Sequence, residues 1–572
     1  MSEEYSVKSS SLKGVGLIPI VALLTVAIFA LLFSSESQIG LTWDEPIYMT
    51  AGEQAIHWLG LIANGQTSEA LQDVPFGTGW GLVNEHPPLT RIFTGVGWWA
   101  TRGLLPLPTS QRVGSLALAA MTLAMITVLT ARQRGWAVGL FGLAALLSMP
   151  RLFFHAHLAA IDFPIAAMWM LATLLFYRST LAVAQEEPLR HTRWSLLRAA
   201  LVAGIGLGLA LLTKINAVLL LPYWLLWLLS NRRLWRTWPL YLLSIPIALF
   251  VLIAGWPWIW KDPIGGLQNW FAFFFNHYEI RQWFAGHLYI DTPSYLPGLL
   301  AAITIPLPLL LLALAAPFFF VWRWLRAHLT LVSHEWAWFS LQLVGVAVNW
   351  LYYGFVGRIH DQERLLLPIF FHVALLSGEG FARLILPLTW RLCDWLKIEQ
   401  RWQTVVATLA AFLLLWPGIS STLYFHPFEL AYYNSLVGGI RGARSRDLET
   451  IYFASTYSYF LPELKKLPAH SKLWVMPNSW DVIDYYQVNG LLTNELEPLR
   501  PEGWGSFYDD RGARFAIGGL EQADYALIEF RQTTFNKIIP EYAIQVEWAA
   551  SKPMISQLEI DGVPLAALYA KE

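Results

Sequence analysis

Two adjacent carboxylates, Asp44 and Glu45, follow the first long apolar run, within the stretch Leu41 to Tyr48. Charge at a membrane boundary is costly unless water, a partner or a function keeps it there. One interpretation is a hydrated loop in which either acid caps a helix from Pro46 to about Ala63. The other is chemical, because a carboxylate at the lip of the membrane can act as a general base.

Glu85 and His86 stand directly before Pro87 and Pro88. Each proline fixes its own φ and restricts the residue before it, so this corner would hold both polar side chains in a set direction below the first acidic loop. A structural turn leading into an interfacial helix is the competing interpretation. Arg112, before the next long apolar run, is a candidate anion ligand in the same region.

A further acid, Asp162, begins another apolar run shortly after His155 and His157. With Pro164 close behind it, Asp162 is suited to cap a helix, and capping alone requires no function. The two histidines could ligate a metal with nearby acids, or they could be an ordinary hydrogen-bonding pair. The sequence therefore leaves a divalent metal possible and does not require one.

Two basic positions are suited to bind an anion. Lys214 lies between two apolar runs with almost no loop to solvate it, so it needs a counter-ion such as a lipid phosphate, or it snorkels to the headgroups. Arg364 opens a later run close to Arg358, and a guanidinium can bind a phosphate through two hydrogen bonds. Pairing of Arg364 with Asp361 or Glu363 is the alternative.

The composition indicates that the scaffold that positions these residues is embedded in a membrane. Of 572 residues, 56% are apolar and only 14% are charged, which is typical of an integral membrane protein and not of a soluble one. A net charge of −1, without a basic patch, gives no reason to expect nucleic acid as a partner. Cys393 is the only cysteine, so neither a disulfide framework nor a cysteine metal site can form.

Eleven runs are long enough to cross a membrane as helices. The first is 14–34, and the others lie near 113–131, 136–154, 160–177, 197–213, 215–230, 238–257, 297–322, 336–354, 364–381 and 404–423. Five alternate connections carry Arg132/Arg134, Arg178/Arg190/Arg193/Arg198, Arg232/Arg233/Arg236, Arg323/Arg326 and Arg383/Arg391/Lys397/Arg401, and basic loops of this kind face the cytoplasm.

Alternation then places the unusual polar residues together on the outer side. We expect a cytoplasmic N-terminus, a first external loop over 35–112 with interfacial helices, and an extracytoplasmic C-terminal domain in a plasma membrane protein. Gly204 and Gly208, four residues apart within an apolar run, predict close helix packing and not a nucleotide loop.

The character of the chain changes after Thr422. We expect a membrane domain over 1–423 and a soluble extracytoplasmic α/β domain over 424–572. The pattern predicts strands at 472–476, 523–530, 543–548 and 565–570, and helices at 458–466 and 481–489.

Taken as an ordered set, these residues resemble the GT-C superfamily of polytopic glycosyltransferases, in the branch of protein O-mannosyltransferases and the lipid A aminoarabinose transferase. The resemblance covers residues 1 to about 440 and rests on Trp43-Asp44-Glu45, Glu85 to Leu89, Arg112, His155 to Pro164, Lys214 with Pro222, Glu363-Arg364 to Pro368, and His426 to Gly439. It implies an α-helical membrane bundle of the GT-C type, whereas the α/β outer domain is expected from the residue pattern and departs most from the well-known members of the superfamily.

The resemblance also implies an activity: transfer of a sugar from a polyprenyl phosphate to an acceptor at the outer face, with inversion at the anomeric carbon. Asp44 matches the family's catalytic base and Asp162 its second acid, while Lys214 and Arg364 match ligands of the lipid phosphate. We expect substrate contacts from Glu45, Glu85, His86, Arg112, His155, His157 and Arg358 as well. The acceptor could be a protein, a lipid or a glycan.

Two other classes of function fit this pattern less well. A transporter or flippase would place ionisable residues near the bilayer midplane on broken helices, whereas here they crowd one end of the runs. An inactive assembly protein with a partner-binding outer domain would have no need for Asp44, Asp162, Lys214 and Arg364 together.

Overall fold

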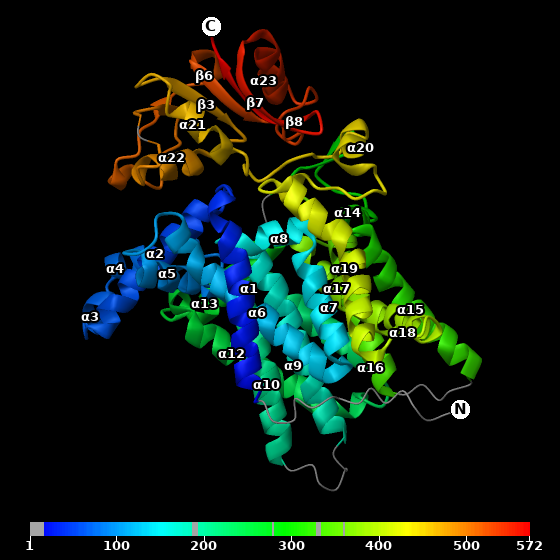
Figure 1. Ribbon diagram of the computed structural model, residues 1–572. Helices are drawn as coiled ribbons and strands as arrows, with labels where there is room; N and C mark the ends of the chain where they lie inside the picture. Colours follow the sequence, from blue (N-terminus) through cyan, green and yellow to red (C-terminus); the bar gives the residue numbers. More distant parts are fainter. Residues whose placement is uncertain (1–15, 186–192, 277–278, 328–332, 358–360, 493) are drawn as a thin grey trace.

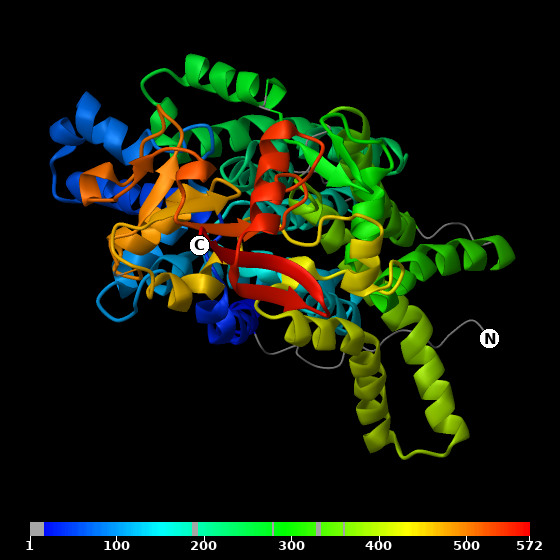
Figure 2. The same cartoon turned by 90° about the horizontal axis from the view of Figure 1, so that it is seen from above.

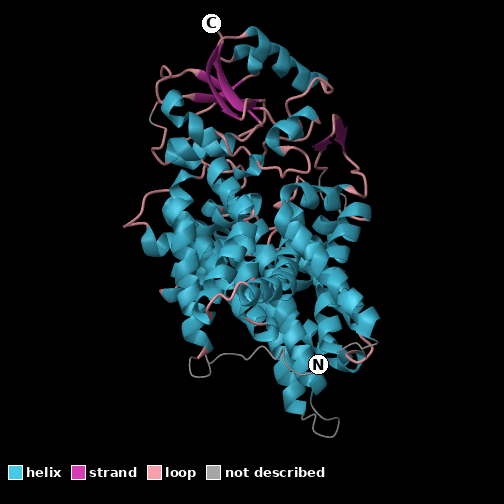
Figure 3. Ribbon diagram, turned by 45° about the vertical axis from the view of Figure 1, so that its right-hand side comes forward, coloured by secondary structure: helices cyan, strands magenta, loops and turns pink. Residues whose placement is uncertain are grey.

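The computed structural model describes residues 16–572 apart from 186–192, 277–278, 328–332, 358–360 and 493. Long helices form a bundle, and a layer that contains a β-sheet covers one end of it (Figure 1). Apart from one small hairpin, the strands gather in that layer (Figure 3). The predicted fold class, a helical membrane bundle followed by an α/β domain, is confirmed, while the boundary at 423/424 stays a prediction.

Seven of the described helices are long and apolar enough to cross a membrane. They are α1 (Leu17–Ser35), α6 (Thr109–Arg134), α9 (Asp162–Gln185), α10 (Arg193–Leu211), α12 (Trp238–Gly255), α17 (Leu367–Gly380, within the span 364–395) and α19 (Gln400–Phe425). The chain is therefore a multi-span membrane protein.

Two further spans are broken. The helix α7 (Trp136–Leu147) meets α8 (Pro150–His157) at 79°, and α14 (Leu296–Thr304) meets α15 (Leu307–Ala327) at 119°. A proline lies at each break, at 150 and 306, where its ring cannot continue the preceding helical hydrogen bonding.

The structure reduces the expected count of about eleven spans to nine at most within the described residues. The run near 215–230 forms only a shorter helix, Ile215–Leu229, which includes α11 (Leu220–Leu229). The run near 336–354 lies in α16 (Ser333–Phe355), whose length suffices but whose tryptophans and buried amides, such as Gln342, make it less apolar.

Helix packing in the bundle follows one of the predicted motifs. A Cβ added at Gly204 would lie 2.6 Å from Ile247 Cβ, and one at Gly208 would lie 2.5 Å from Val251 Cβ. The two glycines of α10 therefore allow α12 to approach closely, as predicted.

The segment predicted as the first external loop forms helices at the bundle end that faces the sheet. They are α2 (Glu45–Ala63), α3 (Thr67–Ala70), α4 (Asp73–Trp80) and α5 (Leu89–Thr101). At 13 residues α5 is too short for a full crossing, and its interfacial position stays a prediction. Another short helix, α13 (Pro263–Phe275), lies on the same side (Figure 1).

The layer over the bundle end, which we call the outer domain because the charge pattern predicts that it is extracytoplasmic, is built on a six-stranded sheet in the order β5-β4-β3-β6-β8-β7. Its strands are β3 (Lys472–Met476), β4 (Glu497–Arg500), β5 (Ala516–Ile517), β6 (Tyr525–Glu529), β7 (Met554–Ile560) and β8 (Val563–Ala570). The first four are parallel, and β6, β8 and β7 are antiparallel neighbours. The sheet lies over the bundle when seen from above (Figure 2).

One predicted strand is wrong. Residues 543–548 belong to helix α23 (Pro540–Ser551). Alternating Ile544, Val546 and Trp548 suggested a strand, but the helix starts with a proline at its first turn and buries Gln545 and Ala549, four residues apart. The helices predicted at 458–466 and 481–489 correspond to a short helical stretch over 457–464 and to α22 (Trp480–Val488).

A shared hydrophobic cluster joins the outer layer to the bundle. It contains Leu41 and Met49 of the first external loop, Phe154 of α8, Tyr452 of the connecting segment and Leu527 of β6. Because these side chains bury one another, the outer domain holds the acidic loop against the membrane part.

Candidate active site

The side chain of Asp44 does not cap helix α2. It makes no capping hydrogen bond and instead accepts one through Oδ2 from Arg364. The backbone N–H of Trp43 donates to Phe453 O at 3.2 Å, and this hydrogen bond anchors the turn that carries Asp44. Burial raises the pKa of Asp44, and the carboxylates of Asp162 and Asp361 add to this, while Arg364 opposes it.

Asp162 lies at the first residue of α9 and joins two cations. Lys214 Nζ donates to its Oδ1 at 2.7 Å, and Arg364 Nε donates to its Oδ2 at 2.9 Å. Lys214 occupies the extended break between α10 and the helical turn at 215–219, which points its stem inward. Because its side chain is only 10% exposed and paired, Lys214 does not snorkel to a headgroup layer.

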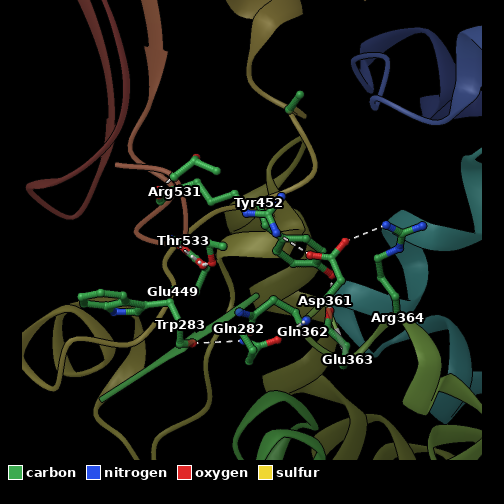
Figure 4. Close-up of polar contacts among 12 residues, drawn as sticks. Gln282, Trp283, Asp361, Gln362, Glu363, Arg364, Glu449, Tyr452, Arg531 and Thr533 are labelled. Carbon is green, nitrogen blue, oxygen red and sulfur yellow. Dashed lines mark hydrogen bonds and ion pairs between the residues drawn. The ribbon is translucent and has the colours of Figure 1, made fainter. Parts of the chain in front are cut away.

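Arg364 binds three carboxylates with one guanidinium. Besides Asp162 and Asp44, it contacts Asp361 Oδ2 through Nη1 at 2.7 Å, and it stacks over the ring of Phe453 with its Cζ 4.0 Å from the ring centroid. The predicted alternative of pairing with Asp361 is thus realised, as Figure 4 shows.

The side chain of Glu363 does not join Arg364 but belongs to a separate buried network of hydrogen bonds. Arg151 Nη1 donates to its Oε2 at 2.5 Å, and the Tyr452 hydroxyl donates to its Oε1 at 2.6 Å. His155 Nε2 lies 3.2 Å from the same hydroxyl. This network fixes the segment on which Arg364 stands.

The cluster is completed from the outer domain. Arg531 Nη2 donates to Asp361 Oδ1 at 2.5 Å. Three carboxylates and three cations then form one connected cluster: Asp44, Asp162, Asp361, Lys214, Arg364 and Arg531. With every group ionised the charges balance, so an added anion competes with carboxylates for the cations.

A cavity of about 830 Å³ opens beside this cluster. From the membrane part it is lined by Asp44, Tyr48, Glu85, His86, Lys214 and Arg364, among others. From the outer domain it is lined by Ser479, Asp481, Arg531, Thr533, Glu541 and Tyr542, among others. Five of the predicted site residues therefore share one cavity, and Asp162 lies behind it, holding two cations.

The predicted substrate ligands Glu45 and Arg112 do not line this cavity; both are fully buried in a bidentate ion pair. Arg112 Nε and Nη2 donate to Glu45 at 2.8 and 2.7 Å, and Nη1 lies 3.3 Å from Glu36 Oε1. Glu45 also accepts from Ala159 N at 2.9 Å. The pair ties the acidic turn to α6 and supports the site from behind.

We expect Arg112→Met to destabilise the folded protein by about 3–5 kcal/mol, because it leaves Glu45 and Glu36 buried without a cation. Thermal unfolding in detergent measures this loss. The exposed Arg102, replaced in the same way, is the control. A normal unfolding temperature for Arg112→Met would contradict the structural role.

His155 and His157 do not line the cavity. His157 Nε2 lies 3.0 Å from Ser35 Oγ and His155 contacts Tyr452, so each follows the hydrogen-bonding alternative. Among the described residues no group of three His, Cys, Asp or Glu could hold a metal ion. Arg358, another predicted ligand, lies outside the described residues.

Sequence reasoning missed the outer-domain wall of the cavity. Arg531 follows directly on the predicted strand 523–530, and residues at strand ends are common site residues, which was the available signal. The sequence predicted Asp361 only as an alternative ion-pair partner of Arg364 and not as a site residue. Nothing in the sequence pointed to Asp481 or Glu541.

The chain is similar to a family model and to several solved structures. A family model described as dolichyl-phosphate-mannose-protein mannosyltransferase matches residues 99–258, less than half of the chain. The comparison with curated proteins gives no match.

Solved structures extend the likeness over almost the whole chain. ArnT from Cupriavidus metallidurans bound to undecaprenyl phosphate has a TM-score of 0.50 and 15% identity, covering 96% of this chain and 98% of ArnT. Apo ArnT gives 0.50 and 14%, covering 97% and 98%. The archaeal oligosaccharyltransferase AglB from Archaeoglobus fulgidus, in complex with an inhibitory peptide and a dolichol-phosphate, gives 0.48 and 12%, covering 91% and 70%.

The fold is thus that of the GT-C glycosyltransferases, as the resemblance predicted. Within that class it is similar to ArnT from end to end, outer domain included.

Proposed function

We propose that this protein is an inverting glycosyltransferase that moves a sugar from a polyprenyl phosphate to an acceptor hydroxyl at the outer face of the plasma membrane. One observation carries the proposal: the carboxylate of Asp44 and the cations of Lys214 and Arg364, distant in sequence, line the same cavity. The polyprenyl-phosphate sugar, an acceptor and membrane lipids are the partners it implies.

Lys214 and Arg364 are the proposed ligands of the donor phosphate. A phosphate on them would compete with Asp162 and Asp44, which hold the same cations. Because a lipid phosphate is already an acidic leaving group, cations can stabilise its developing charge without a proton donor. Asp162 would keep both cations in place during the exchange.

Asp44 is the proposed base. Its side chain is 29% exposed on the cavity, so an acceptor hydroxyl can reach it. When a phosphate engages Arg364, Asp44 loses the cation that stabilises its ionised form and becomes more basic. Attack by the activated hydroxyl from the face opposite the phosphate inverts the anomeric carbon.

Glu85 and His86 remain proposed substrate contacts because both line the cavity. The ring of His86 lies 6.2 Å from Tyr48 and 5.9 Å from Phe273, centroid to centroid. A polar wall edged by aromatic rings suits a sugar, which offers both hydroxyls and apolar faces.

The orientation follows from the loops. The basic connections predict which bundle end is cytoplasmic, and the cavity lies at the opposite end, beneath the sheet domain. The placement of charge also argues against a transporter. Asp162 opens α9, Arg364 precedes α17 and Lys214 follows α10, and the cavity that Lys214 and Arg364 line is also lined by the sheet domain, so these charges stand at one end of the bundle and not at its middle.

Transfer by purified protein in vesicles with a polyprenyl-phosphate sugar tests the proposal. We expect glycosylated acceptor from envelope extract, with inverted anomeric configuration by NMR. Mass spectrometry of envelope glycans, lipids and proteins from cells with and without this chain identifies the acceptor. Retained configuration, or no difference between the two envelopes, would contradict the proposal.

A further inference from the structure

The segment that carries Arg364 is strained. Asp361 and Gln362 have φ of 47° and 61°, in the left-handed region that non-glycine residues rarely adopt. Two such residues in succession persist only where their surroundings hold them, and strain of this kind gathers at functional sites. The contacts that hold this segment therefore control where the Arg364 guanidinium points.

Besides the Glu363 network, two contacts from other parts of the chain hold it at its strained residues. Gln362 N donates to Gln282 Oε1 at 2.9 Å, and Arg531 binds Asp361 from the outer domain at 2.5 Å (Figure 4). Both members of the second contact are buried, with side chains 5% and 4% exposed. Asp361 thus stands between two guanidiniums, one from each part of the protein.

The outer domain fixes Arg531 in turn. It lies two residues after the end of β6, and its Cζ is 4.6 Å from the centroid of the Trp43 ring, next to the proposed base. Nearby, Thr533 N donates to Glu449 Oε2 at 3.2 Å, and Thr456 Oγ1 donates to Glu529 Oε2 at 2.9 Å. These bonds join the sheet to the segment that connects it to the bundle.

We infer that Arg531 is a positioning residue of the transfer reaction: through Asp361 it directs Arg364 and makes the phosphate site depend on the docked outer domain. The inference rests on the proposed function, because it assigns Arg364 to the donor phosphate. Without Arg531, Asp361 has only Arg364 as a cation. The strained segment then loses its contact with the outer domain, the Arg531–Asp361 ion pair, which we call the clamp.

Net charge and positioning, as two explanations of the Arg531–Asp361 contact, predict the same effect of Arg531→Gln but different effects of Asp361→Asn and of the double variant. If only net charge matters, Arg531→Gln weakens phosphate binding, Asp361→Asn strengthens it, and the double variant, whose charge balance is restored, binds like the wild type. If the clamp positions Arg364, both single variants weaken binding and the double variant stays as weak as either one.

The experiment measures the Kd of undecaprenyl phosphate for the full-length protein in nanodiscs. We expect Kd to rise about tenfold for Arg531→Gln, Asp361→Asn and the double variant alike, with Arg531→Lys closer to the wild type. Arg511→Gln is the matched control, because Arg511 forms another ion pair between the outer domain and α2, with Glu53 at 3.3 Å, away from the cavity.

A tighter Kd for Asp361→Asn, or a wild-type Kd for the double variant, would overturn the inference. Loss of folded protein lowers the number of sites per molecule, whereas a misdirected Arg364 changes Kd, so the two are separable. If Arg531→Gln fails to fold, Asp361→Asn and Arg531→Lys decide the question. No binding by the wild type would refute the proposed donor class itself, whereas weakening by Lys214→Gln but not by Arg531→Gln would refute only this inference.

Discussion

Asp44→Asn is expected to lower the rate of sugar transfer by about 10²- to 10⁴-fold, the usual contribution of a general base. The fold should survive, because Asp44 makes no cap bond to α2 and asparagine keeps its size. Transfer in vesicles, compared with thermal unfolding of the same preparation, measures both effects. Full activity would remove Asp44 from the role of base.

The pH profile gives a second measurement on the same residue. A base must be deprotonated, so activity falls as the pH drops through its pKa. Because burial raises the pKa of Asp44, the acid limb of the profile should lie above about 3.9, the value for a free aspartate. Asp44→Glu, which retains a carboxylate, should keep an acid limb at reduced rate, and a limb unchanged in Asp44→Asn would assign it to another group.

Lys214→Gln is expected to weaken binding of undecaprenyl phosphate by about 10- to 100-fold, the range for losing a hydrogen bond to a charged group. Lys214 suits this test better than Arg364, whose removal would leave three carboxylates facing one another. Calorimetry or fluorescence titration in nanodiscs measures the Kd.

The control for this prediction is Lys261→Gln. Lys261 pairs with Asp73 on the surface at 2.7 Å and lies outside the cavity lining, so its loss should leave the Kd unchanged. Lys214→Arg should retain part of the affinity because the cation remains. Equal affinities for the wild type and Lys214→Gln would place the phosphate elsewhere.

Local sequence patterns were sufficient for several features of the fold. Nine of the eleven expected runs coincide with candidate spans, because apolar length is a property of one segment and its solvent. The glycine spacing in α10 correctly predicted close packing with α12. Strand β3 was predicted at its observed bounds, whereas α23 was not, since its alternating apolar residues fit a strand as well as a helix.

Sequence by itself determined that this is a membrane protein whose unusual polar residues stand at one end of its spans, and it singled out Asp44, Lys214 and Arg364. Only the tertiary structure decided the partners: Arg364 with Asp44 across 320 positions, Glu45 with Arg112, and Arg531 with Asp361. Hydropathy and charge are local and can be read residue by residue. An ion pair depends on which helices and strands meet, and that is fixed only when the bundle and the outer sheet pack together.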